Sequence, residues 1–146
     1  MDVTTARLYE LLKDLIRAVG MLHHSLPGEP LTLSQTFALH ELDLGRPLSQ
    51  QELAERLGLE KSSVSRLAAD LERKGLLVRE RDPANRRFYR LRLTDRGRAH
   101  HARAGALFRE RIAPLLDAMT AAERAALVKG LTGLFRAMRE HEARSA

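Results

Sequence analysis

Residues 49–93 read SQQELAERLGLEKSSVSRLAADLERKGLLVRERDPANRRFYRLRL. Ser49 and Glu52 have the spacing of a capping box, in which each side chain satisfies a backbone N–H group at the start of a helix. Gly58 stands where this first helix must end in a tight turn with positive φ. Apolar residues at helical spacing then predict a second helix over residues 61–74, and Gly75 ends it. The stretch therefore opens as helix, tight turn and helix.

The remainder of the stretch predicts a two-stranded hairpin with an excess of arginine. Residues 76–81 and 87–93 have the alternation of strands, and Asp82, Pro83 and Asn85 are turn-forming residues between them. Residues 76–98 contain eight arginines, three acidic residues and no lysine. Arginine binds phosphate through paired hydrogen bonds and enters narrow minor grooves. The hairpin is therefore predicted to contact DNA.

The second helix is expected to present one apolar face and one small, polar face. Val64, Leu67 and Leu71 form the apolar line. On the other face, small side chains allow close approach to the major groove and Arg66 can bind a guanine edge through two hydrogen bonds. The candidate DNA-contacting residues of this helix are Lys61, Ser62, Ser63, Ser65, Arg66 and Arg73. Taken alone, the pattern of this helix also fits an ordinary amphipathic helix whose polar face contacts only solvent. The arginine-rich hairpin directly downstream favours DNA binding instead.

Helices are predicted on both sides of this stretch. Residues 6–24 and 123–140 repeat apolar positions at helical spacing, and further helices are expected over about 32–44 and from about 95 to 119. The apolar stripes of the two terminal helices are wider than a small DNA-binding domain could bury. Exposed stripes of that size usually form an interface, so two copies of the chain are expected to associate.

The whole chain resembles the MarR family of winged-helix regulators. The resemblance is carried by residues 48–97, above all by the wing tip Asp82-Pro83-Ala84-Asn85-Arg86-Arg87 and by the ending Leu93-Thr94-x-x-Gly97. It implies a mainly α fold with a small β-wing, in which residues 31–97 form a winged helix-turn-helix and residues 1–30 and 98–146 form a helical dimerisation region. It further implies that Arg86 reads the minor groove, with Arg87 and Arg90 as further DNA contacts from the same hairpin. Asp82 and Asn85 are expected to stabilise the wing, Asn85 standing where the family often has aspartate.

The predicted function is that of a sequence-specific transcriptional regulator, with repression as the usual role in the resembling family. A two-fold dimer predicts a pseudo-palindromic operator whose half-sites lie about one DNA turn apart. The resemblance also implies release by a small aromatic or anionic ligand, for which the sequence assigns no binding residues. Arg17, His23, His40 and Arg111 are polar groups that could line such a crevice, and each is interpreted as a surface residue. The alternative is a non-specific DNA-binding or protein-interaction module without a ligand response.

Other classes of function have little support in the sequence. The chain has 146 residues, no cysteine and no tryptophan, and only 4% of its residues are aromatic, which disfavours thiol chemistry and binding by base stacking. The histidines lack His-x3-His spacing and no catalytic motif occurs, so neither a metal, a cofactor nor an enzyme activity is expected. The N-terminus lacks a signal sequence, and a cytoplasmic protein without a membrane span is expected.

Overall fold

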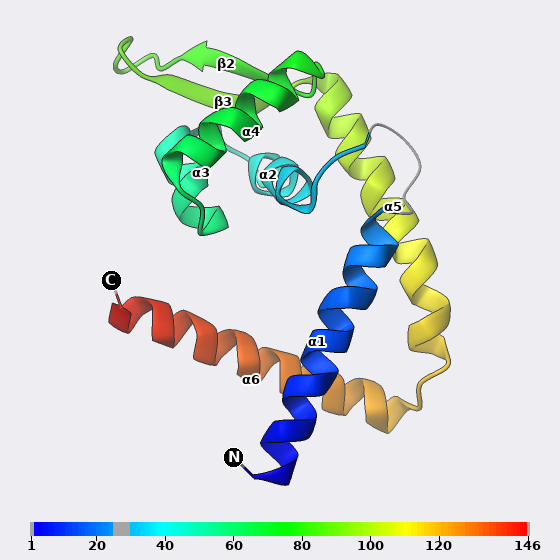
Figure 1. Ribbon diagram of the computed structural model, residues 1–146. Coiled ribbons are helices and arrows are strands. Elements are labelled where there is room, and N and C mark those ends of the chain that lie inside the picture. Colours follow the sequence, from blue (N-terminus) through cyan, green and yellow to red (C-terminus); the bar gives the residue numbers. More distant parts are fainter. Residues whose placement is uncertain (1, 25–29, 146) are drawn as a thin grey trace. The chain divides into compact units, whose positions relative to one another are not determined.

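The computed structural model describes residues 2–24 and 30–145, without the side chains of residues 22–24 and 145 (Figure 1). Within these residues the elements are α1 (Val3–His24), α2 (Leu33–Asp43), β1 (Leu48–Ser49), α3 (Gln50–Leu57), α4 (Lys61–Arg73), β2 (Leu77–Arg81), β3 (Tyr89–Leu93), α5 (Asp95–Asp117) and α6 (Ala121–Ser145). The chain divides into two compact units, residues 1–108 and residues 109–146. This mainly α architecture with a small β-wing confirms the predicted fold class.

The helix boundaries follow the capping residues that the sequence predicts. Ser49 accepts a hydrogen bond from the backbone N–H of Glu52, and the Glu52 carboxylate accepts one from the backbone N–H of Ser49, at 3.1 and 2.7 Å. Thr32 and Gln35 form the same reciprocal pair at the start of α2. Gly58 and Gly75 have φ values of 62° and 70°, which side-chain-bearing residues adopt only at a cost. Local chemistry therefore sets the ends of the two helices that form the helix-turn-helix.

The sheet has three antiparallel strands in the order β1-β3-β2. Leu77 pairs with Leu93 at the base of the hairpin, and Leu48 of β1 pairs with Leu91 on the other side of β3. The predicted sheet had only the two hairpin strands and missed β1. A strand of two residues is too short to show the alternation of apolar and polar residues that predicts a strand. Strand β1 forms because β3 offers a free edge.

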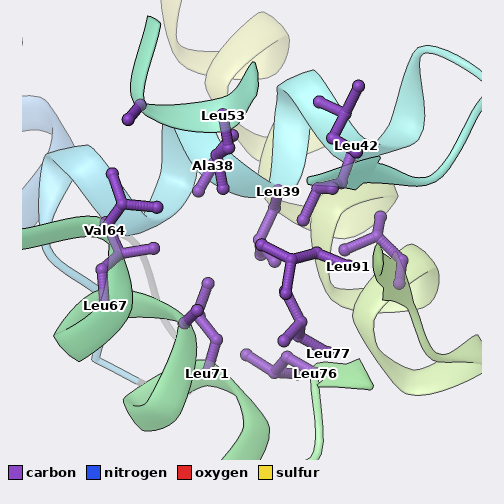
Figure 2. Close-up of a cluster of buried hydrophobic side chains, with 14 residues drawn as sticks. Ala38, Leu39, Leu42, Leu53, Val64, Leu67, Leu71, Leu76, Leu77 and Leu91 are labelled. Atoms are coloured by element: carbon purple, nitrogen blue, oxygen red, sulfur yellow. The ribbon is translucent and has the colours of Figure 1, made fainter. Parts of the chain in front are cut away.

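The core of the first unit is almost entirely aliphatic. Figure 2 shows leucines from the two helix-turn-helix helices, from α2 and from the strands converging on one cluster. Leu39, Leu53, Leu71 and Leu91 are all at most 1% exposed. Each fully buried leucine stabilises the fold by about 1.5–3 kcal/mol relative to an exposed one. This cluster holds α2, α3, α4 and the strands together as one body.

The segment Leu93-Thr94-x-x-Gly97 joins the wing to α5 by close backbone packing. The Thr94 hydroxyl donates to the carbonyl of Gly75 at 2.7 Å and accepts from the backbone N–H of Gly97 at 3.0 Å. A Cβ atom added at Gly97 would lie 2.0 Å from the carbonyl oxygen of Leu76. Glycine is therefore required at this position, since any side chain would push α5 away from the start of β2.

The helices at the two ends of the chain expose apolar side chains. In α1, Leu8, Leu15 and Ile16 are 53%, 48% and 72% exposed. In α6, Val128 and Phe135 are 66% and 53% exposed. Among the described helices, none combines the length and the apolar character that crossing a membrane requires.

Candidate nucleic-acid interface

Helix α4 divides its side chains between the core and the surface as the sequence predicts. Val64, Leu67, Ala68 and Leu71 are buried. The residues predicted to face DNA lie on the rest of the helix: Lys61, Ser62, Arg66 and Arg73 are exposed, and Ser63 and Ser65 are half-buried. The side chain of Glu60 makes no capping hydrogen bond to α4. The first turn thus combines small side chains with a helix N-terminus, an arrangement suited to close approach of a phosphate or a base edge.

The C-terminal half of α4 is fixed to α2 through Asp70. The amide nitrogen of Gln35, which is 6% exposed, donates to the Asp70 carboxylate at 2.5 Å. Lys74 lies 3.2 Å from the same carboxylate and donates to the carbonyl oxygen of Pro30 at 2.8 Å. Hydrogen bonds from Arg73, Gln35 and Lys74, in that order of importance, lower the pKa of Asp70 to about 2. Arg73, predicted as a DNA contact, is thus already paired with Asp70 within its own helix.

Arg79 fastens the hairpin to α4. Its guanidinium lies 3.2 Å from the Glu72 carboxylate and donates to the backbone carbonyl of Ser65 at 3.4 Å. Both partners belong to α4, whereas Arg79 lies in β2. Arg79 therefore holds the wing and α4 in a fixed relation, a role that its place in a run of arginines does not reveal.

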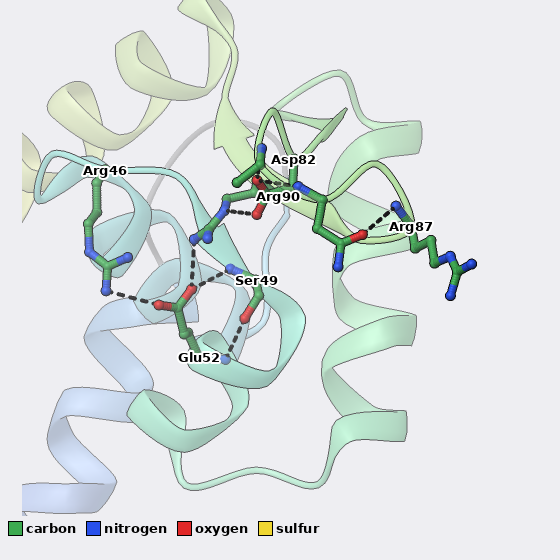
Figure 3. A network of polar contacts seen from close by, with 8 residues as sticks. Arg46, Ser49, Glu52, Asp82, Arg87 and Arg90 are labelled. Carbon is green, nitrogen blue, oxygen red and sulfur yellow. Dashed lines mark hydrogen bonds and ion pairs between the residues drawn. The ribbon is translucent and has the colours of Figure 1, made fainter.

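Asp82 organises the turn of the wing (Figure 3). One carboxylate oxygen accepts hydrogen bonds from the backbone N–H groups of Ala84 and Asn85 at 2.8 and 3.4 Å, and the other accepts from Arg90 at 2.7 Å. The bond from Ala84, followed by that from Arg90, lowers the pKa of Asp82. Asn85 accepts from the backbone N–H of Arg87 at 3.2 Å, so its amide supports the same turn.

Glu52 connects three parts of the winged helix-turn-helix, as Figure 3 shows. Besides capping α3, its carboxylate lies 2.9 Å from Arg46, in the segment before β1, and 3.2 Å from Arg90 in β3. The backbone bond from Ser49 is the main reason that the pKa of Glu52 is lowered, and Arg46 contributes further. The capping box identified Glu52 as a helix start, but no local pattern could pair it with an arginine 38 residues away.

The cations of the hairpin and of the neighbouring helices differ in whether they pair with a carboxylate. Arg90 pairs with Asp82 and Glu52, Arg92 pairs with Glu80, and Arg98 pairs with Asp95. Among the described residues, Lys61, Arg66, Arg86 and Arg87 make no ion pair, and all four are exposed. Cations without a carboxylate partner are the ones available to phosphates. The ion pairs of Arg90 give it a structural role in the wing, and its predicted contact with DNA stays a prediction.

Comparison with known proteins places this arrangement in a family. The sequence model of the MarR family matches residues 29–87. The PcaV transcriptional regulator from Streptomyces coelicolor, solved in complex with its natural ligand, is 30% identical, with a TM-score of 0.70 over 94% of this chain and 97% of that one. RV1404 from Mycobacterium tuberculosis is 29% identical, with a TM-score of 0.78 over 93% of this chain and 92% of that chain.

A third structure extends the likeness of the fold. Streptococcus pneumoniae FabT, solved in complex with DNA, has a TM-score of 0.84 over 93% of this chain and 98% of that one, at 21% identity. The fold of this chain thus recurs along almost the whole length of these proteins. The chain belongs to the MarR family of DNA-binding transcriptional regulators.

Proposed function

We propose that this protein is a sequence-specific transcriptional repressor that binds a pseudo-palindromic operator as a homodimer and is released by a small-molecule ligand. The observation that carries the proposal is a set of exposed cations that make no ion pair with the part of the chain that the structure describes. They lie on α4 and at the wing tip: Lys61, Arg66, Arg86 and Arg87. Arg66 is assigned to a base edge in the major groove, and Arg86 to the minor groove. The serines at 62, 63 and 65 leave room for the DNA.

The proposed homodimer is supported by two separate observations: α1 exposes an apolar face, and so does α6. Ile16 and Val128 are 72% and 66% exposed in the single chain, and both belong to longer apolar stripes. Such stripes usually become buried in an interface. A two-fold dimer would present two copies of α4 to successive turns of the major groove.

Release by a ligand is supported by a cavity of about 410 Å³ within the first unit, lined by residues of α1, α2 and α5. A volume of this order is typical of small-molecule sites. The related PcaV was solved with its natural ligand. A ligand that binds one dimer geometry more tightly than another would shift the population away from the DNA-binding form.

The test is binding of the purified protein to DNA from upstream of its own gene, followed by fluorescence anisotropy. Arg66→Ala should weaken binding by about 1–3 kcal/mol and relax specificity at one base position. Arg86→Ala should weaken the contact with DNA at the flanks of the site and lower the salt dependence of the DNA affinity. Arg17→Ala is the matched control, because it removes the same charge from an exposed arginine that pairs with Asp14 on α1, outside the winged helix-turn-helix. Wild-type binding by both the Arg66 and the Arg86 variants would refute the assignment.

Competition with unrelated DNA separates this proposal from a non-specific winged-helix module. At physiological salt a sequence-specific regulator should prefer its own site by about 10³-fold or more. A non-specific binder would lose its site to an equal mass of unrelated duplex and would show a steep salt dependence with both DNAs.

A further inference from the structure

The peptide group that joins Arg86 to Arg87 is held by side chains at both of its polar atoms. Its carbonyl oxygen accepts a hydrogen bond from the Nη1 atom of Arg81 at 2.6 Å. Its N–H group, which belongs to Arg87, donates to the side-chain oxygen of Asn85 at 3.2 Å. Rotation of this peptide would break at least one of the two bonds. The backbone between the two wing-tip arginines is therefore fixed before DNA arrives.

Arg81 can act on this peptide because its own guanidinium is held over an aromatic ring. The Cζ atom of Arg81 lies 4.6 Å from the centroid of the Tyr89 ring. Arg81 ends β2 and Tyr89 begins β3, and the two residues pair across the antiparallel strands. A cation at this distance is attracted to the electron-rich face of a tyrosine ring. Tyr89 thus keeps the Arg81 guanidinium at the base of the turn, within reach of the Arg86 carbonyl.

Arg81 differs from the other arginines of the two strands in its choice of partner. Arg79, Arg90 and Arg92 all pair with carboxylates. Within the part of the chain that the structure describes, Arg81 makes no ion pair, and its partners are a backbone carbonyl and a ring. No carboxylate there competes for its N–H donors, so they are available to the turn. A hydrogen bond from a charged donor is also stronger than one between neutral groups.

The side chains of Arg81 and Arg86 share one hollow at the wing tip. They line it together with Asp82 and Pro83. Two guanidinium groups in one hollow repel each other, which favours positions of the Arg86 side chain that extend away from Arg81. The fixed carbonyl and this repulsion both reduce the number of conformations open to Arg86. A side chain that is already restricted loses less conformational freedom when it binds.

We infer that Arg81 is a positioning residue for Arg86: supported by Tyr89, it fixes the carbonyl of Arg86 and so directs the Arg86 side chain into the minor groove. This role rests on the proposed function, since it requires that Arg86 reads that groove. Tyr89 then contributes to DNA binding through Arg81, without contacting DNA. Removal of its ring should therefore weaken DNA binding although the charge of the wing stays the same.

Tyr89→Leu is the main variant, because it removes the ring and leaves every charge in place. Its affinity for upstream DNA, measured by fluorescence anisotropy, should fall about two- to fivefold per wing, the range expected for an exposed cation–ring contact. Tyr89→Phe keeps the ring and is the matched control, which should bind as the wild type does. Arg81→Ala removes the same contact from the other side and should also weaken binding. Wild-type affinity in both Tyr89→Leu and Arg81→Ala would overturn the inference.

A double-mutant cycle with Arg86→Ala separates positioning from direct contact. The carbonyl bonded to Arg81 belongs to the backbone, so Arg86→Ala keeps it. If Tyr89 and Arg81 act through the Arg86 side chain, Tyr89→Leu should cost almost no further affinity in the Arg86→Ala background. An undiminished cost there would overturn the inference. So would a loss confined to Arg81→Ala with a salt slope lower by about 1 per wing, since that result marks a phosphate contact of Arg81 itself.

Hydroxyl-radical footprinting adds a measurement that a general loss of stability would not reproduce. Hydroxyl radicals cut DNA at sugar atoms that are exposed in the minor groove, so a bound Arg86 should protect the flanks of the site. With DNA saturated by protein, Tyr89→Leu should lose protection at the flanks and keep it elsewhere, as Arg86→Ala does. A footprint that keeps the flanks, or that weakens evenly along the site, would overturn the inference. Circular dichroism verifies that each variant is folded at the assay temperature.

The behaviour of the wild type keeps the two proposals separable. A wild type that does not prefer its upstream DNA to unrelated DNA refutes the proposed function, and the positioning role with it. A wild type that binds specifically, with Tyr89→Leu and Arg81→Ala equal to it in affinity and footprint, refutes the positioning role alone and leaves the proposed function intact.

Discussion

Replacing Gly97 by alanine should destabilise the first unit far more than the size of one methyl group suggests. An added Cβ would lie 2.0 Å from the carbonyl oxygen and 2.9 Å from the carbonyl carbon of Leu76, whereas ordinary van der Waals contact begins at 3.4 Å. The obstructing atoms belong to the backbone, so no change of rotamer can relieve the collision. The same carbonyl accepts a hydrogen bond from the backbone N–H of Thr94, which resists its displacement.

The expected loss of folding stability in Gly97→Ala follows from two opposing effects. Alanine favours a helix over glycine by up to about 1 kcal/mol, and overpacking against a fixed neighbour costs about 1–3 kcal/mol or more. Because the neighbour here is backbone, we expect a net loss of about 2–3 kcal/mol. For a chain of this size that corresponds to a fall of roughly 5–10 °C in Tm, measured by circular dichroism. DNA affinity should fall as well at temperatures where the variant is folded, because α5 begins where the wing ends.

Gly130→Ala is the matched control for this substitution. Gly130 lies within α6, and an added Cβ there meets nothing within 4 Å in the single chain. This variant should be as stable as the wild type or slightly more so. If Gly97→Ala unfolds at the same temperature as Gly130→Ala, the close approach of α5 to Leu76 does not constrain the fold and the reasoning is wrong.

Two further predictions concern carboxylates that join elements of the winged helix-turn-helix. The pKa of Asp70 is lowered to about 2 from an ordinary value of 3.8. Its contribution to stability is therefore complete above that ordinary value and is lost as the pH falls towards 2. The midpoint of urea unfolding should fall less steeply over this pH range in Asp70→Asn than in the wild type, and equal slopes would contradict the prediction. Glu52→Gln keeps a hydrogen-bond acceptor for the helix cap but weakens the pairs with Arg46 and Arg90, at a cost of up to about 1 kcal/mol in stability. It should also loosen the wing, so that Arg86→Ala costs less DNA affinity in the Glu52→Gln background; full additivity in a double-mutant cycle would exclude the coupling.

The internal ion pairs change how the basic character of the hairpin is understood. The sequence places eight arginines in residues 76–98, and all of them contribute to the same excess of charge. In the folded chain, Arg79, Arg90 and Arg92 brace the wing against α4, α3 and its own opposite strand. Arg86 and Arg87 remain at the tip without carboxylate partners among the described residues. Charge counting therefore identifies the hairpin as basic but cannot divide its arginines between folding and binding.

Local signals in the sequence determined the elements of this protein. Capping boxes at Thr32 and Ser49, glycines with positive φ at 58 and 75, and alternation in residues 89–93 depend on neighbours a few residues apart, and the structure confirms them. Tertiary structure alone decided the rest, because it brings together residues that are far apart in the chain. Examples are the two-residue strand β1 on the edge of β3, the joining of Glu52 to Arg90, and the placement of His40 beside His101. An ion pair or a cavity wall has no periodicity of its own, so only the packing of α2, α3, α5 and the hairpin could reveal it.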